Sequence, residues 1–587
     1  MRKAKLLSAA LAASMLLTAC GSGSGAASAT TAASGQGGEA KTEAKAEAGK
    51  SEEKNESESE STPMITFQNC NDYDVYYYDQ ITPDASRKST VNTDERYPAI
   101  TIAGPGPSEL QPYNTTDQYK ENFIWECYEF LLYRTANGEY EGRLAKDWKW
   151  EDDTHFLVTL YDYIHDWEGN PIKASDVVFS YNLCVDSGYA TGFEGFGYDS
   201  CEVVDDYTVR FNFKQKPTTV VAFNDIFAKL VCIVSEKAYG EHNFAVDPVG
   251  TGPYKLKEFI TDSKFVMEAN DDYWQKDELR SEYAKANVQE ITSLDMEETF
   301  QMMNGLLDGT LLNDIDFEDE DLPKFLPGGE YAGQYNLMIS PGANVHGTIP
   351  NCSANSPMSD INFRMAVWYA IDNEAIASAL SMRYTPATVV SNPAVEDWND
   401  EWFTWKNCIS DYDPELAKEY LAKTDYKGEE IVIVLDKSYK ALAQVMQGYL
   451  AEVGINASIN IVDKALINDE VADPTKWDIY LYKSRNQKPA ACKLQDFLDA
   501  NYGVAEGKNL AQVEDPKLQE MIETATGADT YSKENTDALM QYVIDNGYVY
   551  STFYPLSVHL YNKKVAGFCW RYGTSKPVLG ACDYYFD

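Results

Sequence analysis

Residues 125–182 carry the densest run of secondary-structure signals in the chain and constrain its fold more than any other stretch. Apolar side chains at helical spacing predict an amphipathic helix over 125–132. The alternation of apolar and polar residues over 155–162 predicts a half-buried strand. Turn-forming residues occupy 168–171, and Ser175 can then N-cap a helix with an apolar face. The order of these four signals is more specific than any one of them.

Three later segments have patterns with a clear structural meaning. Residues 247–254 read DPVGTGPY, in which the glycines allow backbone angles that other residues avoid and Pro253 stiffens the exit. Residues 361–380 place apolar residues on one helix face, and Asp372 can cap a second helix there. Residues 413–415 (DPE) have the N-cap, the proline and the acidic first turn of a helix start. These segments predict loops and helix starts.

Taken in order, these motifs resemble the family 5 extracellular solute-binding proteins, the peptide- and nickel-type receptors of ABC importers. The resemblance covers roughly residues 99–560. Besides the segments above and residues 270–274 (NDDYW), the matching residues are Gly142, Leu144, Ala145, Trp148, Trp150, Asp153, His165, Asp166, Pro171, Asp176 and Val177. The chain departs from the family pattern where Trp167 and Glu168 interrupt a His-Asp-Gly turn. It departs again at Gln111, which replaces an Asp in a turn that borders the ligand cleft.

The resemblance implies an α/β fold of the periplasmic-binding-protein type. Two main lobes with mixed sheets would surround a hinge, and a smaller subdomain would be inserted in the first lobe. The chain from residue 63 on is too long for one ordinary hydrophobic core, which agrees with several lobes. We expect lobe I with its insertion over 63–311, lobe II over 312–547 and a C-terminal return to lobe I over 548–587. Two strand connections between the lobes would form the hinge.

The first residues read as an export signal rather than as part of the folded protein. A basic start precedes an apolar run over 6–17, which is shorter than the ~20 residues of a membrane-spanning helix. Residues 17–20 (LTAC) resemble a bacterial lipobox, which implies removal of residues 1–19 and lipidation of Cys20. The alternative is an ordinary secretory signal in which this cysteine is incidental. The composition of residues 20–62 predicts a disordered, lipid-anchored tether.

Composition and motifs exclude several classes of function. A net charge of −44 disfavours nucleic acid and anionic lipid as partners. No motif of a nucleophilic or nucleotide-dependent enzyme occurs in a suitable context, so we expect no catalytic residue and no cofactor. No CxxC occurs and no Cys/His pair has zinc spacing, so we expect no metal site. With Cys20 lipidated, ten of the eleven cysteines remain, either as disulfides or as buried thiols.

The resemblance implies a binding receptor and not an enzyme. Two lobes would close on a small solute, in the first place a peptide, and the closed form would dock on the permease of an ABC importer. The protein would act as a monomer outside the cytoplasm, on the outer face of the cytoplasmic membrane or in the periplasm, and its lipid alone would hold it to the membrane. The alternative is a surface lipoprotein that is an enzyme acting on extracellular glycans or a polysaccharide-binding protein. Export, acidity and abundant Tyr and Trp also allow that alternative.

The resemblance also indicates which loops would reach the ligand. They are the turn near residue 112, the loop over 389–410, the loop after a strand at 431–435, and the loop after the last strand. The expected ligand-binding residues are Tyr113, Asn114, Asn392, Trp398, Trp402, Trp405, Tyr439, Lys440, Arg485 and Asn486. For the tryptophans the alternative is core packing, and for the charged residues it is a solvated loop position.

The last of these loops bears on the class of ligand. Peptide receptors of the family carry an Asp there that pairs with the α-ammonium of the peptide. Residues 482–489 (YKSRNQKP) have no carboxylate and instead carry the cations Lys483, Arg485 and Lys488. A buried ammonium without a carboxylate costs on the order of several kcal/mol, so dipeptides with a free N-terminus are disfavoured. Longer peptides held through their backbone, anionic peptides and sugars stay open.

Overall fold

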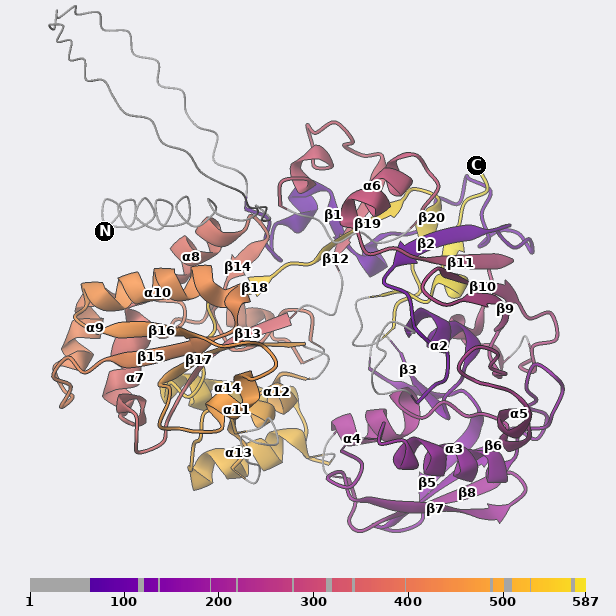
Figure 1. Ribbon diagram of the computed structural model, residues 1–587, viewed down its shortest axis with the longest axis horizontal. Coiled ribbons are helices and arrows are strands. Elements are labelled where there is room, and N and C mark those ends of the chain that lie inside the picture. Colours follow the sequence, from indigo (N-terminus) through magenta and orange to yellow (C-terminus); the bar gives the residue numbers. More distant parts are fainter. Residues whose placement is uncertain are drawn as a thin grey trace, which may run out of the picture.

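The computed structural model describes residues 64–113, 121–135, 138–190, 192–217, 220–276, 279–312, 319–339, 344–395, 397–485, 489–500, 509–527, 529–571 and 576–587. Figure 1 shows two bodies side by side, here named lobe I (right in the view) and lobe II (left), with a small sheet between them near the top. Lobe I holds β2 to β11, and lobe II holds β13 to β17. The mixed α/β fold with two lobes confirms the expectation from the sequence.

Lobe I is built on two four-stranded sheets. The first has the order β2-β11-β10-β9, in which β2 and β11 are parallel and the other neighbours are antiparallel. The second, here named the inserted sheet, has the order β5-β6-β8-β7 and is antiparallel throughout. The elements of lobe I are β2 Ile100–Gly104, α2 Glu121–Cys127, β3 Leu132–Arg134, β4 Tyr140–Gly142, β5 Ala145–Trp150, β6 His155–Leu160, α3 Ala174–Asp186, β7 Tyr198–Asp205, β8 Thr208–Phe213, α4 Val220–Asn224, α5 Glu236–Glu241, β9 Tyr254–Ile260, β10 Lys264–Ala269, β11 Glu290–Asp295 and α6 Thr299–Leu307.

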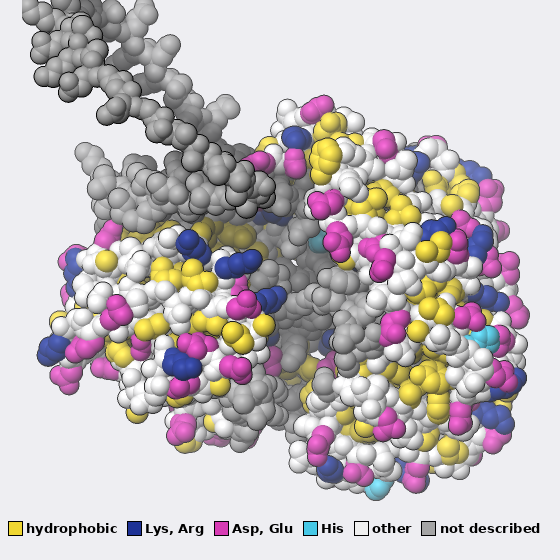
Figure 2. Space-filling view, viewed as in Figure 1, with side chains coloured by type: hydrophobic (Ala, Val, Ile, Leu, Met, Phe, Trp, Pro, Cys, Tyr) yellow, Lys and Arg dark blue, Asp and Glu magenta, His cyan; other side chains and the backbone are white. Residues whose placement is uncertain are grey.

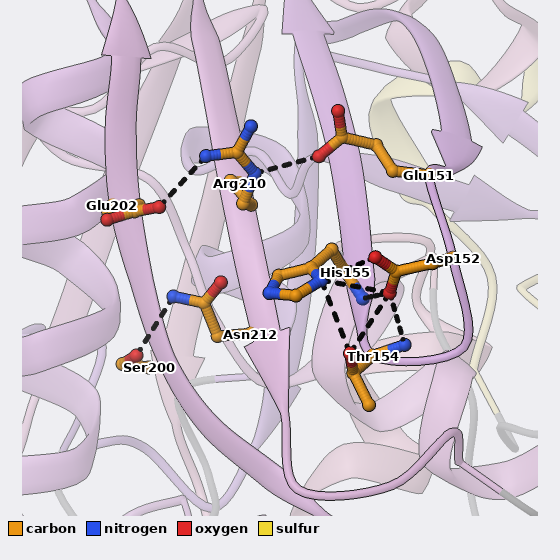
Figure 3. Close-up of polar contacts among 8 residues, drawn as sticks. All are labelled: Glu151, Asp152, Thr154, His155, Ser200, Glu202, Arg210 and Asn212. Carbon is orange, nitrogen blue, oxygen red and sulfur yellow. Dashed lines mark hydrogen bonds and ion pairs between the residues drawn. The ribbon is translucent and has the colours of Figure 1, made fainter.

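The inserted sheet has one buried face and one polar face, as the alternating sequence predicts. Phe156 on β6 and Phe211 on β8 point inward and are at most 1% exposed. On the outer face Arg210 lies between two carboxylates, Glu151 at 2.7 Å and Glu202 at 3.0 Å (Figure 3). Side chains alternate between the faces of a strand, so the periods read from the sequence correctly assign both faces.

The start of the region at residues 125–132 differs from the predicted helix, and that prediction is wrong. Helix α2 already ends at Cys127, and the next strand, β3, begins at Leu132. Between them Glu129 turns into the interior, where it is 1% exposed and its carboxylate accepts from Arg143 Nε at 2.6 Å. A buried carboxylate without a cation costs more free energy than the loss of one helical turn. We therefore attribute the end of the helix to this ion pair.

The cap of α3 also differs from the prediction. Ser175 lies inside the helix, because α3 begins one residue earlier, at Ala174. The start is fixed instead by Asp176, whose carboxylate accepts from the backbone N–H of Lys173 at 2.8 Å. An acidic group in the first turn satisfies a helix N-terminus as well as a hydroxyl before it does.

Lobe II contains a four-stranded mixed sheet surrounded by helices. Its order is β13-β17-β15-β16, with β15 parallel to both β16 and β17 and β13 antiparallel to β17. Asp372 and Asp413 cap α8 and α9 through their side chains, as predicted. The elements are β13 Asn344–Pro350, α7 Ile361–Tyr369, α8 Asn373–Leu380, β14 Tyr384–Pro386, α9 Pro414–Leu421, β15 Ile431–Leu435, α10 Lys440–Glu452, β16 Ala457–Ile461, α11 Ile467–Val471, β17 Ile479–Arg485, α12 Ala490–Leu498, α13 Pro516–Thr526, α14 Lys533–Asp545 and β18 Phe553–Pro555.

The sheet between the lobes has three strands in the order β1-β12-β19, namely Val75–Tyr77, Tyr335–Ile339 and Val558–Asn562. The chain enters lobe II after β12, because β13 follows it, and leaves lobe II after β18, because β19 follows that strand. These two connections agree with the hinge expected from the sequence. The C-terminal chain then forms β20 Val565–Gly567 and β21 Asp583–Tyr584 against lobe I.

A third segment, which the sequence does not predict, also joins the lobes. Residues 64–98, here named the strap, begin on lobe II, where the backbone N–H of Ile65 donates to the carbonyl of Met382 at 2.7 Å. The strap supplies β1 to the central sheet. It then reaches lobe I, where the N–H of Tyr97 donates to the carbonyl of Asn287 at 2.7 Å. The strap therefore runs from one lobe to the other across the hinge.

The buried apolar residues form three clusters. One fills lobe II and includes Ile65 and Phe67 of the strap, one lies under the β2–β11 sheet, and one lies under the inserted sheet. The thiols of Cys569 and Cys582 are buried and are not in a disulfide. Within the described ranges, no helix combines the length and the apolar composition that a membrane crossing requires. Asp and Glu side chains are spread over the visible face of both lobes with Lys and Arg between them (Figure 2).

Candidate functional site

A cavity of about 1050 Å³ lies in lobe II where its parallel strands end. It is bounded by the carboxyl ends of β15, β16 and β17 and by the loops that follow the first two. The lining residues are Asp436, Lys437, Ser438, Tyr439, Ile461, Val462, Asp463, Lys464, Ile467, Asn468, Tyr480, Leu481 and Tyr482. In open α/β sheets ligands bind beyond the carboxyl ends of the strands, so this is the expected position for a ligand site.

The fold brings this end of the sheet to the hinge. The last residue of β17, Arg485, is the backbone partner of Asn344, the first residue of β13. Strand β13 is the strand by which the chain enters lobe II from the central sheet. The cavity therefore opens at the side of lobe II from which the chain crosses to the other lobe. A site in this position would be completed or released by relative motion of the lobes.

The loop after β15 is held by a local cap. Asp436 accepts from the backbone N–H and the hydroxyl of Ser438, at 2.8 and 2.5 Å, which forms a short 3₁₀ turn over Lys437–Tyr439. Helix α10 begins directly afterwards, at Lys440. An Asx turn of this kind stiffens a loop, so the side chain of Tyr439 has a fixed place at the cavity.

Three tyrosines form one wall of the cavity. Tyr480 and Tyr482 are two residues apart on β17 and share a face of the strand, with ring centroids 5.4 Å apart. Tyr439 comes from the loop after β15 and is 7% exposed. Its hydroxyl has no hydrogen-bond partner among the described residues. Burial raises the pKa of Tyr439 well above its usual value, so the hydroxyl keeps its proton.

The described lining residues carry equal numbers of charges of the two signs. Asp436 and Asp463 are acidic and Lys437 and Lys464 are basic, so there are two of each among them. The excess of acidic residues in the whole chain is therefore not found among the described lining residues. The cations that the sequence places on the last ligand loop, Lys483, Arg485 and Lys488, have side chains outside the described part of the structure.

Of the predicted site residues, Tyr439 is the one that lines the cavity. Lys440 is the exposed first residue of α10 and is not part of the lining. Arg485 ends β17, and its side chain lies outside the described part of the structure, as do Asn114 and Asn486. For Lys440 and Arg485, ligand contact stays a prediction.

The predicted residues of the loop over 389–410 lie in the packed part of lobe II. Trp402 is fully buried, and Trp398 and Trp405 pack against it with ring centroids at 5.1 and 6.1 Å. Asn392 is fully buried, and its side-chain oxygen accepts from the N–H of Ala394 at 2.8 Å. None of these four predicted residues lines the cavity. Their contact with a ligand stays a prediction, while their packing in the core is what the structure shows.

Tyr113 lies in lobe I and is not among the residues that line the cavity. It is 5% exposed in the core under the inserted sheet, and its hydroxyl donates to the carbonyl of Cys232. A tyrosine with a satisfied hydroxyl and a buried ring has a packing role, which sequence alone does not distinguish from ligand contact.

Tyr480 and Tyr482 are functional candidates that the sequence prediction missed. The signal was present, because both residues fall on one face of the strand that leads to the predicted ligand loop. Ile461, Val462 and Asn468 were also missed, and they had no comparable signal. Their place at the cavity depends on the parallel pairing of β16 with β15, which joins distant segments.

A second cavity of about 520 Å³ lies at the opposite end of the lobe II sheet, and its lining includes Phe363, Tyr426 and Trp477. Its most buried carboxylate, Asp478, is satisfied by the hydroxyl of Ser356 at 2.6 Å and by a backbone N–H. This end of the strands is remote from the crossing to lobe I. We therefore assign the ligand site to the larger cavity.

Comparisons with known proteins agree with this geometry. An oligopeptide-binding protein, OppA, of Bacillus subtilis is 23% identical over 414 residues, which cover 65% of this chain and 71% of that protein. A dipeptide-binding protein of Escherichia coli is 27% identical over 356 residues, which cover 54% of this chain and 60% of that protein. The chain thus spans three fifths of the length of the second relative.

Solved structures share the fold. The structure of HbpA2 from Haemophilus parasuis superposes with a TM-score of 0.70 at 20% identity and covers 83% of this chain and all of that one. The family model described as "Bacterial extracellular solute-binding proteins, family 5 Middle" matches residues 139–498, which is more than half of the chain. The chain therefore belongs to the family 5 bacterial extracellular solute-binding proteins.

Proposed function

We propose that the protein captures a small solute, in the first place a peptide, between its two lobes and delivers it to an ABC importer. The observation that carries the proposal is the cavity at the carboxyl ends of β15, β16 and β17, next to the strands that cross between the lobes. The names of the B. subtilis and E. coli relatives support a peptide as the ligand.

Family membership makes the protein a binding protein for transport and not an enzyme. Of the alternatives that the sequence left open, the surface enzyme is therefore excluded. Binding would use the energy of ligand contacts to favour the closed arrangement of the lobes. Within the described residues, no cluster of three or more His, Cys, Asp or Glu side chains could hold a metal ion.

The family is extracytoplasmic, and we propose a more specific location for this protein. We infer that Cys20 carries a lipid and that residues 20–62 tether the lobes to the outer face of the membrane. The expected partners are the permease subunits, with the protein itself a monomer. We propose lobe I over 63–311 and 548–587 and lobe II over 312–547, with two changes: the start of the strap packs on lobe II, and so does the chain up to the end of β18.

The test is to identify what the protein carries. The mature protein is purified from cells, its bound solutes are released and analysed by mass spectrometry, and its thermal stability is then measured with peptide mixtures of two to eight residues. The proposal expects bound peptides, together with a rise in Tm that grows with peptide concentration.

A matched pair of variants locates the site. Tyr482→Ala in the large cavity should abolish the rise in Tm, whereas Tyr426→Ala in the smaller cavity should keep it. Absence of peptides both from purified protein and from the stability assay would contradict the peptide part of the proposal.

A further inference from the structure

We infer that the cavity of lobe II selects an uncharged aromatic side chain of the bound peptide, and best of all a phenolic one. The inference rests on the proposed function, because it names the side chain that a peptide ligand would place in the site. It is carried by three features of the lining residues, which are the tyrosine wall, four aliphatic side chains, and the hydroxyl of Tyr439, which has no hydrogen-bond partner among the described residues.

The tyrosine wall offers ring faces and edges to a ligand. Tyr480 and Tyr482 lie with their centroids 5.4 Å apart and their planes at 47°, and Tyr439 stands at the end of the neighbouring strand. Aromatic rings prefer offset or edge-to-face partners at similar separations, so a further ring is the ligand group that best continues this arrangement. Tyrosine also loses little side-chain entropy when it binds.

Four aliphatic side chains of the lining offer hydrocarbon surface to a ligand, beside the polar residues Asp436, Lys437, Ser438, Asp463, Lys464 and Asn468. Ile461, Val462, Ile467 and Leu481 line the cavity, and Ile461 is 45% exposed at the end of β16. A sugar ring presents hydroxyl groups around its edge, and each would need a polar partner when buried. The four aliphatic side chains offer no partner to such hydroxyls, whereas they pack well against a phenyl or phenol ring.

The balance of charge disfavours ionised side chains. The described lining residues include two lysines and two aspartates, so among them neither sign has an excess that would compensate for the desolvation of a ligand charge. An uncharged side chain avoids this cost. The cavity thus selects against charge as well as in favour of rings.

The hydroxyl of Tyr439 adds a preference for a phenol. It is held in a side chain that is 7% exposed and has no hydrogen-bond partner among the described residues. A buried hydroxyl without a partner is unfavourable, so a ligand that supplies one gains affinity. A phenolic hydroxyl both donates and accepts and can therefore pair with Tyr439 in either direction.

The experiment uses calorimetric titration of the mature protein with pentapeptides Ala-Ala-X-Ala-Ala, in which X is Tyr, Phe, Leu, Asp or Lys. Each peptide is prepared with free ends and with acetylated and amidated ends, so that recognition of the termini is separated from recognition of X. We expect affinity to fall in the order Tyr, Phe, Leu, with Asp and Lys weakest. The Tyr peptide should bind about tenfold more tightly than the Phe peptide, which is the range of one hydrogen bond.

Two variants isolate the hydroxyl. Tyr439→Phe should remove the difference between the Tyr and Phe peptides, because the affinity for the Tyr peptide falls to that for the Phe peptide. Tyr449→Phe is the matched control, because Tyr449 on α10 is also buried, also has a hydroxyl without a described partner, and does not line the cavity. The control should keep the tenfold difference.

The outcomes separate this inference from the proposed function. Equal binding of all five peptides overturns the inference and leaves peptide capture intact. A Tyr-to-Phe difference that survives in Tyr439→Phe also overturns the role of the hydroxyl. Failure of every peptide to bind, in both forms, overturns peptide capture itself.

Discussion

Glu126 of α2 is buried in lobe I, where the residue is 3% exposed. One oxygen accepts from the backbone N–H of Gly580 at 2.9 Å, while the other has no hydrogen-bond partner among the described residues. Burial is the main cause that raises the pKa of Glu126 from its usual 4.5 to about 7, against the lowering effect of Gly580, Arg571 and Arg143. The group therefore prefers to be protonated in the folded protein.

This preference predicts a pH dependence of stability. Because the folded pKa is above the unfolded one, the folded state binds the proton more tightly, and stability falls as pH rises from about 4.5 through about 7. The contribution of this residue across that window is at most about 3 kcal/mol. We expect Glu126→Gln to be more stable than the wild type at pH 8 and to lose that advantage at pH 4.5. Thermal unfolding of both proteins at the two pH values tests this, and an equal difference at both would contradict it.

At the scale of elements, the two faces of the inserted sheet lead us to expect very different losses of stability from substitutions at adjacent residues of β8. Phe211 is fully buried in the core, so Phe211→Ala should cost about 3–5 kcal/mol of unfolding free energy. Arg210 pairs with Glu151 and Glu202 on the solvated outer face, so Arg210→Ala should cost far less than the loss of the buried ring. The shift of the urea unfolding midpoint measures both. Comparable losses would show that the ion pairs (Figure 3) contribute far more than solvated pairs do.

The elements of this protein were predictable where a local pattern controls them. The strands at His155–Leu160 and Thr208–Phe213 and the caps at Asp372 and Asp413 follow the sequence, because alternation and capping are properties of neighbouring residues. The helix predicted over 125–132 does not follow the sequence, and we attribute its early end to the buried ion pair of Glu129 with Arg143, a residue from a different loop.

The candidate site was predictable to a smaller extent for the same reason. Tyr439 was found because it follows a recognisable buried strand. Trp402 packs in the core, and its ligand contact stays a prediction, because a tryptophan in a loop has the same sequence signature whether its ring covers a ligand or fills a core. Ile461 and Asn468 reach the cavity only through the pairing of strands that lie apart in the chain.

At the scale of the whole molecule, the proposed lipid anchor gives a direct prediction. Cys20→Ala should release the protein from the membrane or leave its signal unprocessed, because the lipid is the expected attachment. Fractionation of cells followed by mass measurement of the protein checks both outcomes. A processed Cys20→Ala protein that stays in the membrane fraction would contradict the anchor. Cys582→Ala, a buried cysteine far from the signal, serves as the control and should remain membrane-bound.

The structure of the strap could not be predicted from the sequence. The resemblance that defines the lobes does not cover residues 64–98, and their polar, tyrosine-rich composition has no helical or strand period. Their structure is set by contacts with both lobes, and one of them, between Arg87 and Asp587, joins residues 500 positions apart in the sequence.

The meeting of the strap with the C-terminal chain has a consequence for biosynthesis. The core of lobe I combines early residues such as Phe123 with late ones such as Trp570 and Tyr584. A ribosome and an export channel deliver the early residues long before the late ones, so lobe I cannot close its core while the chain is still emerging. Lobe II has nearly all of its core residues in one continuous stretch and can fold first. A chain cut short before residue 565 would thus carry a finished second lobe and an unfinished first one, which quality-control proteases can recognise.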